Sequence, residues 1–232
     1  MSSAANLVRY YAERAHEYEK IYSIPERQQD LSQLKVRLRD LLAGQSVLEV
    51  ACGTGYWTQV IAQAAKSIVA TDINEQVLCI ARSKQLPDDR VHFMKDDSFK
   101  LESIQRRFTA GFASFWWSHI RKSQLRNFLD VFHSKLLPDA LVVFTDNIYV
   151  EGKYYPITKM DGEGNTYQER RLENGQTYEI LKNFPDESEF KQLLEKKVRN
   201  LRCERLTFYW CLSYDLNEAQ QRGSTELAER LL

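Results

Sequence analysis

The stretch of residues 47–58, VLEVACGTGYWT, is the feature that most constrains the fold. Its apolar first half predicts a buried strand, and Gly53 and Gly55 interrupt that pattern before a helix-compatible segment from Tyr56. Glycines at such a turn let the backbone bend sharply and let a ligand approach the main chain closely. This order of strand, glycine-spaced loop and helix predicts a ligand site at the carboxyl end of a strand in a parallel sheet.

Short apolar segments alternate with helical ones up to residue 145. We predict strands at 46–51, 67–71, 91–95, 108–115 and 141–145, helices at 4–22, 25–42, 56–65, 74–84 and 122–137, and a helical turn near 101–106. Buried strands separated by helices predict an α/β fold with a doubly wound, mostly parallel sheet that is covered on both faces.

The alternation of predicted strands and helices ends after residue 146. Strand-like runs at 154–160, 166–172 and 177–184 are separated by DGEGN and ENGQ, and the Asn-Gly pair is a strong hairpin signal. They predict an antiparallel β meander inserted at 148–184. A helix at 185–197, capped near Asp186 or Ser188, precedes a β-rich run at 201–214, either two strands or one bent strand. The tail from Asn217 is polar and either helical or frayed.

We therefore expect one domain over residues 1–232. It comprises N-terminal helices at 1–43, an α/β core at 44–147, the β insertion at 148–184 and a C-terminal part of the sheet at 185–232. A chain of this length can bury roughly 70% of its unfolded surface, so its stability needs neither a disulfide nor a metal.

The composition narrows the class of partner. The chain carries 32 basic and 32 acidic side chains, and this balance gives no support for a nucleic-acid partner, although a local basic patch stays open. Cys52, Cys79, Cys203 and Cys211 show neither CxxC nor zinc-ligand spacing, so we expect reduced thiols and no metal. No signal-peptide core or membrane-spanning window is found. We expect a cytoplasmic protein with no membrane partner.

Acidic residues end the two strands that follow the glycine loop. Asp72 lies about twenty residues after the loop, where a carboxylate can accept both hydroxyls of a ribose. Asp96 and Asp97 end the next strand, where an acid could reach an adenine amino group. A glycine loop followed by two acidic strand ends favours a nucleoside ligand over a simple connection between elements.

Two common nucleotide motifs fit the loop poorly. A dinucleotide fingerprint has a third glycine that lets helix and strand pack closely, but here Thr58 stands in that place, after bulky Tyr56 and Trp57. A P-loop is excluded because no Gly-Lys-Ser/Thr sequence follows.

These motifs resemble those of the class I S-adenosylmethionine-dependent methyltransferases, small-molecule type. VLEVACGTGYWT matches their first motif, acid-x-x-x-Gly-x-Gly, and VATDIN and VHFMKDDSF resemble the second and third. GFASFWWSHI lies where their fourth strand delivers the active-site loop, and YYAERAHEYEKIY resembles their N-terminal cofactor lid. The resemblance covers about residues 7–214. It implies a Rossmann-like seven-stranded sheet whose last strand is antiparallel.

The resemblance implies S-adenosylmethionine as cofactor and S-adenosylhomocysteine as its product. Glu49 would organise contacts to the cofactor's amino group, Gly53 and Gly55 would approach its methionine part, and Asp72 would hold the ribose. The further cofactor residues implied are Tyr11, Arg14, Trp57, Ile73, Asp97, Ser114 and Phe115, with Arg14 near the cofactor carboxylate.

Other residues are candidates for the acceptor side. His119 follows the fourth strand and is the best-placed histidine for a general base, although a hydrogen-bonded loop histidine is an equal alternative. Trp116 and Trp117 could form an apolar wall for a planar substrate. Tyr18 and Tyr22 share a helical face with Tyr11, with packing on the core as the alternative. Tyr149 and Arg170 belong to the insertion, where Arg170 could meet an acidic substrate or lie on a solvated face.

The expected function is in-line methyl transfer to an oxygen or nitrogen of a small molecule. The Asn/Asp-Pro-Pro-aromatic signature of amino-directed DNA and glutamine methyltransferases is absent, since that place reads Ala-Ser-Phe-Trp-Trp. An RNA or protein methyltransferase is the alternative, and an inactive cofactor-binding partner protein ranks last. The expected partner is a small-molecule acceptor, and a homodimer is possible.

Overall fold

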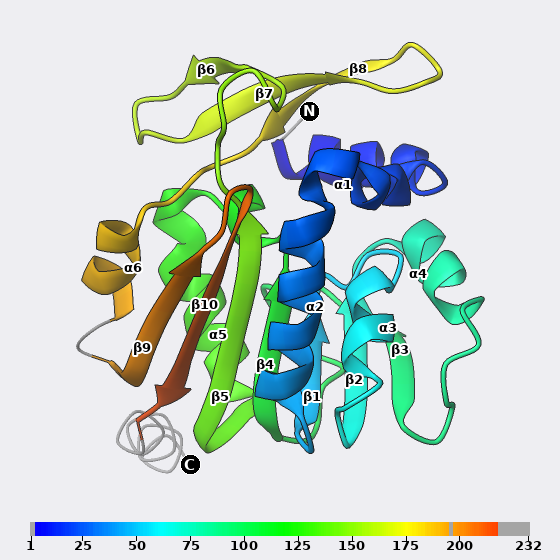
Figure 1. The fold of residues 1–232 in the computed structure, drawn as a ribbon, viewed down its shortest axis with the longest axis vertical. Helices are drawn as coiled ribbons and strands as arrows, with labels where there is room; N and C mark the ends of the chain where they lie inside the picture. Colours follow the sequence, from blue (N-terminus) through cyan, green and yellow to red (C-terminus); the bar gives the residue numbers. More distant parts are fainter. Residues whose placement is uncertain (1–2, 195–196, 218–232) are drawn as a thin grey trace, which may run out of the picture.

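Strand β1 (Ser46–Val50) lies inside a seven-stranded sheet, in the computed structural model that describes residues 3–194 and 197–217 (Figure 1). The order is β3-β2-β1-β4-β5-β10-β9. The other strands are β2 (Ser67–Asp72), β3 (Val91–Lys95), β4 (Phe108–Ser114), β5 (Leu136–Asn147), β9 (Val198–Arg205) and β10 (Tyr209–Leu216). Only the pairs that involve β10 are antiparallel in this sheet. The predicted mostly parallel sheet with an antiparallel last strand is confirmed, and the run at 201–214 belongs to two strands.

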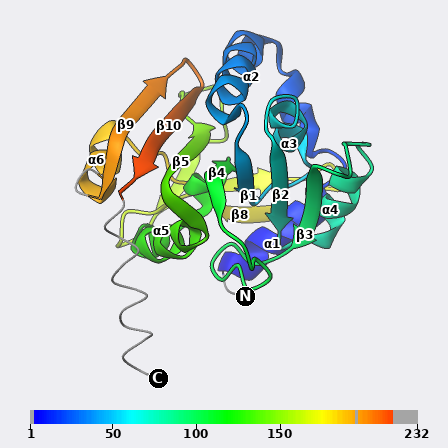
Figure 2. The ribbon, with the colours of Figure 1, turned by 90° about the horizontal axis from the view of Figure 1, so that it is seen from below.

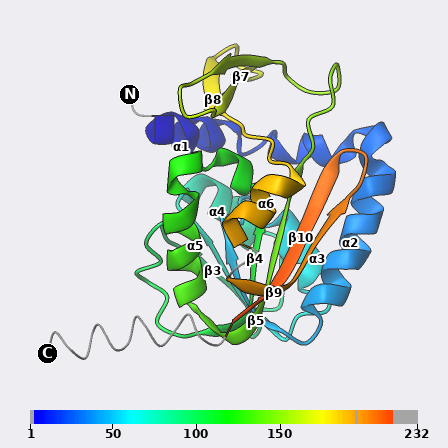
Figure 3. The ribbon, with the colours of Figure 1, turned by 90° about the vertical axis from the view of Figure 1, so that its left-hand side faces the viewer.

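Helices cover both faces of this sheet, which Figures 2 and 3 show edge-on. The helices α2 (Gln28–Leu42), α3 (Tyr56–Ile61) and α4 (Glu75–Arg82) pack in one apolar layer, where Leu38 is fully buried. The opposite layer contains α5 (Leu125–Ser134) and α6 (Glu187–Leu194), with Phe132 fully buried. Apolar residues at helical spacing account for these buried faces. In the described residues, no helix is both long and apolar enough to cross a bilayer.

The N-terminal segment lies across the carboxyl ends of the parallel strands (Figure 1). Helix α1 (Ser3–Arg14) ends sooner than the predicted helix 4–22, and 3-10 turns η1 (Tyr18–Ser23) and η2 (Pro25–Arg27) follow it. The break redirects the chain toward α2 and lets Tyr22 stack on Tyr56, with ring centroids 3.7 Å apart. Burial of these rings outweighs local helix propensity. We call residues 3–23 the lid.

The predicted insertion forms a separate antiparallel sheet with the order β6-β7-β8. Its strands are β6 (Ile157–Met160), β7 (Thr166–Arg171) and β8 (Thr177–Leu181), so the first strand begins later than predicted. This small sheet lies beside α1 over the strand ends (Figure 1). Leu7 and Tyr10 of α1 form an apolar cluster with Leu172, Tyr178 and Ile180.

Two local predictions need correction. Residues 136–137 start β5 and do not extend helix 122–137, and Asp139, with φ of 61°, lies where the register of β5 against β4 shifts. Residues 101–106 form turns, with Leu101 at positive φ and fully buried. Asp186 caps α6 as predicted, since its Oδ1 accepts a hydrogen bond from the Glu189 amide. The tail prediction falls from residue 218 outside the described residues.

Candidate active site

The glycine loop after β1 adopts a conformation that suits glycine at both of its glycine positions. Gly53 and Gly55 have φ values of 56° and 73°. A Cβ on Gly55 would lie 3.0 Å from the Cβ of Ala81 and 3.3 Å from Phe93 Cζ, so this glycine allows loop and helix to pack closely. A Cβ on Gly53 would meet no atom within 4 Å, and Gly53 lines a cavity. The loop therefore leaves room for a ligand against its backbone.

Asp72 fixes this loop and the chain that follows β2. Its Oδ2 accepts the Gly53 amide at 2.9 Å and its Oδ1 accepts the Asn74 amide at 2.9 Å. Burial raises the pKa of Asp72 to about 6, although these amides oppose the shift. Asn74, which the sequence analysis did not select, caps α4 and donates its side-chain amide to the Val8 carbonyl of the lid at 2.9 Å. The side chains at the end of β2 thus contact both loop and lid.

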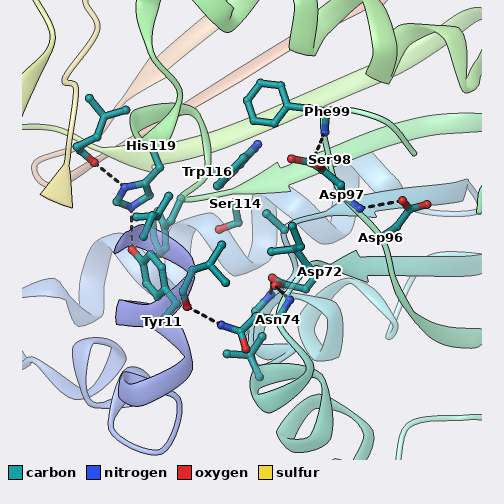
Figure 4. Close-up of a pocket in the computed structure, with 18 of the residues that line it drawn as sticks. Tyr11, Asp72, Asn74, Asp96, Asp97, Ser98, Phe99, Ser114, Trp116 and His119 are labelled. Carbon is teal, nitrogen blue, oxygen red and sulfur yellow. Dashed lines mark hydrogen bonds between the residues drawn. The ribbon is translucent and has the colours of Figure 1, made fainter. Parts of the chain in front are cut away.

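A first cavity of about 230 Å³ opens at the carboxyl ends of β1, β2, β3 and β4 (Figure 4). Ten of the predicted residues line it: Tyr11, Tyr18, Gly53, Asp72, Ile73, Asp97, Ser114, Phe115, Trp116 and His119. Residues that the sequence analysis missed also line it, among them Leu7, Val8, Asn74, Ser98 and Phe99. The lid residues among them carry no motif, because their place depends on how α1 folds over the strands.

Asp96 and Asp97 differ in how they use their carboxylates. Asp96 accepts the Asp97 amide with one oxygen and the Ser103 amide with the other, at 2.8 and 2.9 Å. Asp97 accepts the Phe99 amide at 2.9 Å through Oδ1. Both carboxylates line the first cavity, and Asp97 has the oxygen Oδ2 outside this backbone bond. This agrees with the preference for Asp97 as a ligand.

The lid is joined to the loop after β4 through Tyr11 and His119. Their Oη and Nε2 atoms lie 2.7 Å apart, and Nδ1 of His119 lies 2.7 Å from the Leu181 carbonyl oxygen (Figure 4). A carbonyl only accepts, so Nδ1 carries the proton, and the neutral ring accepts the Tyr11 hydroxyl proton at Nε2. Burial, with Lys182, Arg170 and Arg14 nearby, lowers the pKa of His119 well below its usual value. Both ring nitrogens are therefore engaged in this arrangement.

Glu19 provides a further contact between lid and glycine loop. Its Oε1 accepts hydrogen bonds from Thr54 Oγ1 at 2.6 Å and from Lys84 Nζ at 2.7 Å. Thr54 is buried and lies between the two loop glycines. Together with the contacts of Tyr11 and Val8, this places the lid directly over the first cavity.

A second cavity of about 650 Å³ adjoins the first, and Tyr11, Tyr18, Phe115 and His119 line both. Arg14 and Arg170 line only the second, so the structure separates Arg14 from the first cavity, where the resemblance implied a cofactor contact. Residues missed from the sequence also line it, among them Arg27, Asn147, Lys153, Tyr154, Lys182 and Tyr209. No motif marks them, since the insertion and the strand ends bring them together.

Six predicted residues lie off both cavity walls. Tyr22 and Trp57 pack in the core beneath the lid, and Trp117 packs against Phe144 and Trp210. The ring of Tyr149 lies against Phe184. Gly55 allows close packing of the loop, and Glu49 is buried beneath the loop. Packing is thus the role that the structure gives to Tyr22 and Trp117, in place of a wall for substrate.

Buried polar atoms without partners test whether a nucleoside sulfonium fits this site. Glu49 Oε2, Ser114 Oγ and Trp116 Nε1 are buried and have no hydrogen-bond partner among the described residues. Burial raises the pKa of Glu49 to about 8. A cationic group would relieve the cost of ionising this carboxyl group. The residues present therefore fit a ligand that combines a cation with hydrogen-bonding groups.

Residues 47–139 match a family model described as a methyltransferase domain. Residues 47–139 therefore form a methyltransferase domain, within the fold of the class I, S-adenosylmethionine-dependent enzymes. Demethylmenaquinone methyltransferase of Clavibacter sepedonicus is 34% identical over 74 residues, which span 32% of this chain and 30% of that relative. The matched stretch thus covers under a third of the relative's length.

Solved structures similar to this methyltransferase domain extend over nearly the whole chain. A DhpI complex with SAH has a TM-score of 0.76 and 24% identity, covering 92% of this chain and 97% of that one. A DhpI–SAM–HEP complex has a TM-score of 0.75 and 23% identity, covering 91% and 96%. SAM-bound CalS10, an amino pentose methyltransferase from Micromonospora echinaspora, has a TM-score of 0.60 and 15% identity, covering 86% and 96%. At these identities the likeness shows the fold.

Proposed function

We propose that this protein transfers a methyl group from S-adenosylmethionine to an oxygen or nitrogen of a small molecule bound in the second cavity. The observation that carries the proposal is the pair of adjoining cavities, which share the Tyr11–His119 contact. The first has the glycine loop and the acids, and the second is large enough for a small organic molecule.

When bound, the cofactor would supply a sulfonium methyl group: the acceptor atom would bond to the methyl carbon as the carbon–sulfur bond broke, the electron pair of that bond would stay on sulfur, and a proton on the acceptor would pass to water. In the proposal, Asp72 and Asp97 hold the nucleoside and Ser114 lies toward its amino acid part, while Glu49 acts from beneath the glycine loop, off the cavity wall. The rings of Tyr11 and Tyr18 line both cavities and suit a neighbouring cation. The protein's main contribution is alignment, which can supply roughly 7 to 11 kcal/mol.

His119 has a positioning role in this proposal. Its Nε2 accepts the Tyr11 hydroxyl and its Nδ1 faces the Leu181 carbonyl, so the general-base prediction requires this arrangement to open first. We infer that His119 sets the position of Tyr11, and through it the lid, at the junction of the cavities.

A small acceptor is supported by the position of the second cavity. Tyr155, Pro156 and Arg170 of the insertion line it, so the insertion forms part of its wall. The methyltransferase CalS10, named for an amino pentose, offers a precedent on the same fold. An RNA or protein acceptor would need to approach past this insertion. The inactive cofactor-binding alternative predicts binding without turnover.

The proposed location of the protein is the cytoplasm. Cys52, Cys79, Cys203 and Cys211 are all free thiols, which is compatible with a reducing cytoplasm. A homodimer stays a prediction that light scattering would test.

Calorimetric titration of S-adenosylmethionine and S-adenosylhomocysteine tests the core of the proposal. We expect saturable binding that Asp72→Ala weakens, because the substitution removes the carboxylate and releases the Gly53 amide. Asp130→Ala serves as the matched control, since Asp130 is exposed on α5 and lines neither cavity. Absence of binding, or equal effects of the two substitutions, would overturn it. Turnover with labelled methyl donor and a panel of small acceptors then separates an enzyme from an inactive binder.

A further inference from the structure

The charge on the wall of the second cavity has one sign. Its cationic lining residues are Arg14, Lys20, Arg27, Lys153, Arg170 and Lys182, and its lining contains no aspartate or glutamate. Since the whole chain is electrically balanced, with 32 residues of each sign, this is a local concentration of positive charge. Such a lining attracts and orients an anion.

Some of these cations are already neutralised nearby. Lys182 Nζ lies 2.9 Å from Asp146 Oδ1 and 2.6 Å from Ser118 Oγ, while Lys20 pairs with Glu173 and Lys153 with Glu26. Among the described residues, Arg14, Arg27 and Arg170 form no ion pair with a carboxylate. Three guanidinium groups thus border one cavity without an anionic partner.

Of the three arginines, Arg170 has the strongest need for an anionic partner, because it is only 8% exposed. One of its terminal nitrogens donates to Gln168 Oε1 at 2.8 Å, and its Nε is buried without a hydrogen-bond partner in the described structure. Tyr10 and Tyr155 lie against it, with ring centroids 5.9 and 5.7 Å from its Cζ. A buried charge normally has a charged partner or metal. This site lacks one within the described chain and lines a cavity where a ligand could supply it.

Arg14 faces the same cavity from the lid. Its Cζ lies 5.6 Å from the Tyr10 ring centroid and 5.3 Å from that of Tyr18. Tyr18 lines both cavities, so the guanidinium lies close to the boundary between them. Arg27 is less available, because it donates to the Lys153 carbonyl and lies over the Tyr154 ring.

The positive charges of the second cavity also act on His119, which lines both cavities. After burial, the three charges that lower the pKa of His119 are those of Lys182, which follows β8, Arg170 of β7 and Arg14 of the lid. Cations from separate parts of the chain therefore face one point, next to the Tyr11 hydroxyl.

We propose that the methyl acceptor is a small organic anion whose carboxylate or phosphoryl group is held by Arg170 and Arg14 in the second cavity. This rests on the proposed methyltransferase function and names its substrate class. A guanidinium matches both kinds of anion through paired hydrogen bonds, so the shared chemistry is an anionic group with two or more terminal oxygens. The anion supplies the missing partner of a buried charge, and its position beside Tyr11 and His119 brings the acceptor to the first cavity.

Two pairs of probe compounds test the proposal by binding, without knowledge of the natural acceptor. Benzoate and benzamide share a shape and differ in charge, and phenylphosphonate and its neutral diethyl ester form the phosphoryl pair. Each is titrated in low-salt buffer into protein saturated with S-adenosylhomocysteine. We expect an anion of at least one pair to bind about tenfold or more tightly than its neutral counterpart, and the pair that responds identifies the kind of anion.

Neighbouring arginines provide a matched comparison. Arg170 is buried and Arg171, the next residue of β7, is exposed. Arg170→Gln should weaken binding of the anion about tenfold or more, Arg170→Lys should lose less, and Arg171→Gln should stay within about twofold. The affinity for S-adenosylhomocysteine should be unchanged in all three, which also shows that the variants are folded.

The outcomes separate the two proposals. If S-adenosylhomocysteine binds but no anion is preferred over its neutral counterpart, the anionic acceptor is wrong and the methyltransferase proposal stands. Equal losses for Arg170→Gln and Arg171→Gln, or none for either, would likewise contradict a site at Arg170. If S-adenosylhomocysteine itself does not bind, the proposed function fails and the acceptor proposal fails with it.

Discussion

The Tyr11 hydroxyl donates a hydrogen bond to Nε2 of His119 across 2.7 Å, and this contact joins the lid to the loop after β4. The residues are 108 positions apart in the chain, so only the folded lid brings them together. They line both cavities, which makes their contact the boundary between the two binding sites.

A double-mutant cycle measures this contact. Tyr11→Phe and His119→Ala should each weaken binding of S-adenosylhomocysteine, because each removes the same link to the lid. Their effects should be non-additive, with a coupling energy of about 0.5 to 1.5 kcal/mol, the usual net value of one hydrogen bond. Calorimetric titration of the four proteins checks this. Strictly additive effects would show that the contact does not hold the lid in solution.

Glu19 should control how fast the cofactor leaves. Glu19→Ala removes the hydrogen bonds from Thr54 and Lys84 and frees the lid from the glycine loop. We expect dissociation of S-adenosylhomocysteine to accelerate by a few-fold, measured by stopped-flow displacement. Glu26→Ala is the control, since Glu26 pairs with Lys153 on the exposed surface. A change of the same size in that variant would remove the case for a specific role of Glu19.

The two loop glycines should respond differently to alanine. Both have positive φ and share a backbone penalty of roughly 1 to 2 kcal/mol. Gly55→Ala adds a clash with Ala81 and Phe93, so it should lower the thermal midpoint more. Gly53→Ala places its methyl where no atom lies within 4 Å, at a residue that lines the first cavity, so it should keep more stability and lose cofactor affinity. Thermal unfolding and calorimetry on both variants check this, and equal midpoints would contradict the assigned packing role of Gly55.

Glu49 should make the stability of the ligand-free protein depend on pH. Its pKa rises from 4.5 to about 8 because it is buried, so the folded state retains a proton that the unfolded state loses. Its contribution is fully present below pH 4.5 and is lost as pH rises toward about 8. Glu49→Gln should flatten this dependence in urea titrations between these limits. If the free energy of unfolding depends on pH equally in the variant, other groups cause this dependence. Asp72, with a pKa of about 6, is the first candidate.

The same carboxyl group should release a proton when the cofactor binds. At pH 7 a group with a pKa of about 8 is mostly protonated, and a neighbouring ammonium or sulfonium favours its charged form. Calorimetry in buffers of different ionisation enthalpy should show release of up to about one proton, which Glu49→Gln abolishes. Release that persists in the variant would place the proton elsewhere.

The strand ends were predictable from the sequence because each depends on local chemistry. Gly53, Asp72 and Asp97 follow apolar strands, and parallel strands bring such positions to one edge. The lid was predicted in outline only: its helix ends at Arg14 because Tyr22 packs on Tyr56, a contact that helix propensity does not encode.

The second cavity was largely beyond sequence reasoning. The sequence does not distinguish the adjacent residues Arg170 and Arg171. Which of them is buried depends on which face of β7 packs against the rest of the protein. Lys182 follows β8 and meets Asp146 at the end of β5, a pairing that depends on where the insertion folds. Arg14 was assigned to the cofactor because its helix was, whereas this last residue of α1 lines the second cavity and not the first.

The apolar cluster between α1 and the small sheet bears on the timing of turnover. Leu7 and Tyr10 pack with Tyr178 and Ile180, so apolar contacts join the lid over the first cavity to the small sheet, which forms part of the wall of the second. A motion of the lid that releases S-adenosylhomocysteine would then also weaken the binding of the methylated product. Both departures would share a single kinetic barrier, and the two products would compete for re-entry during the same brief interval.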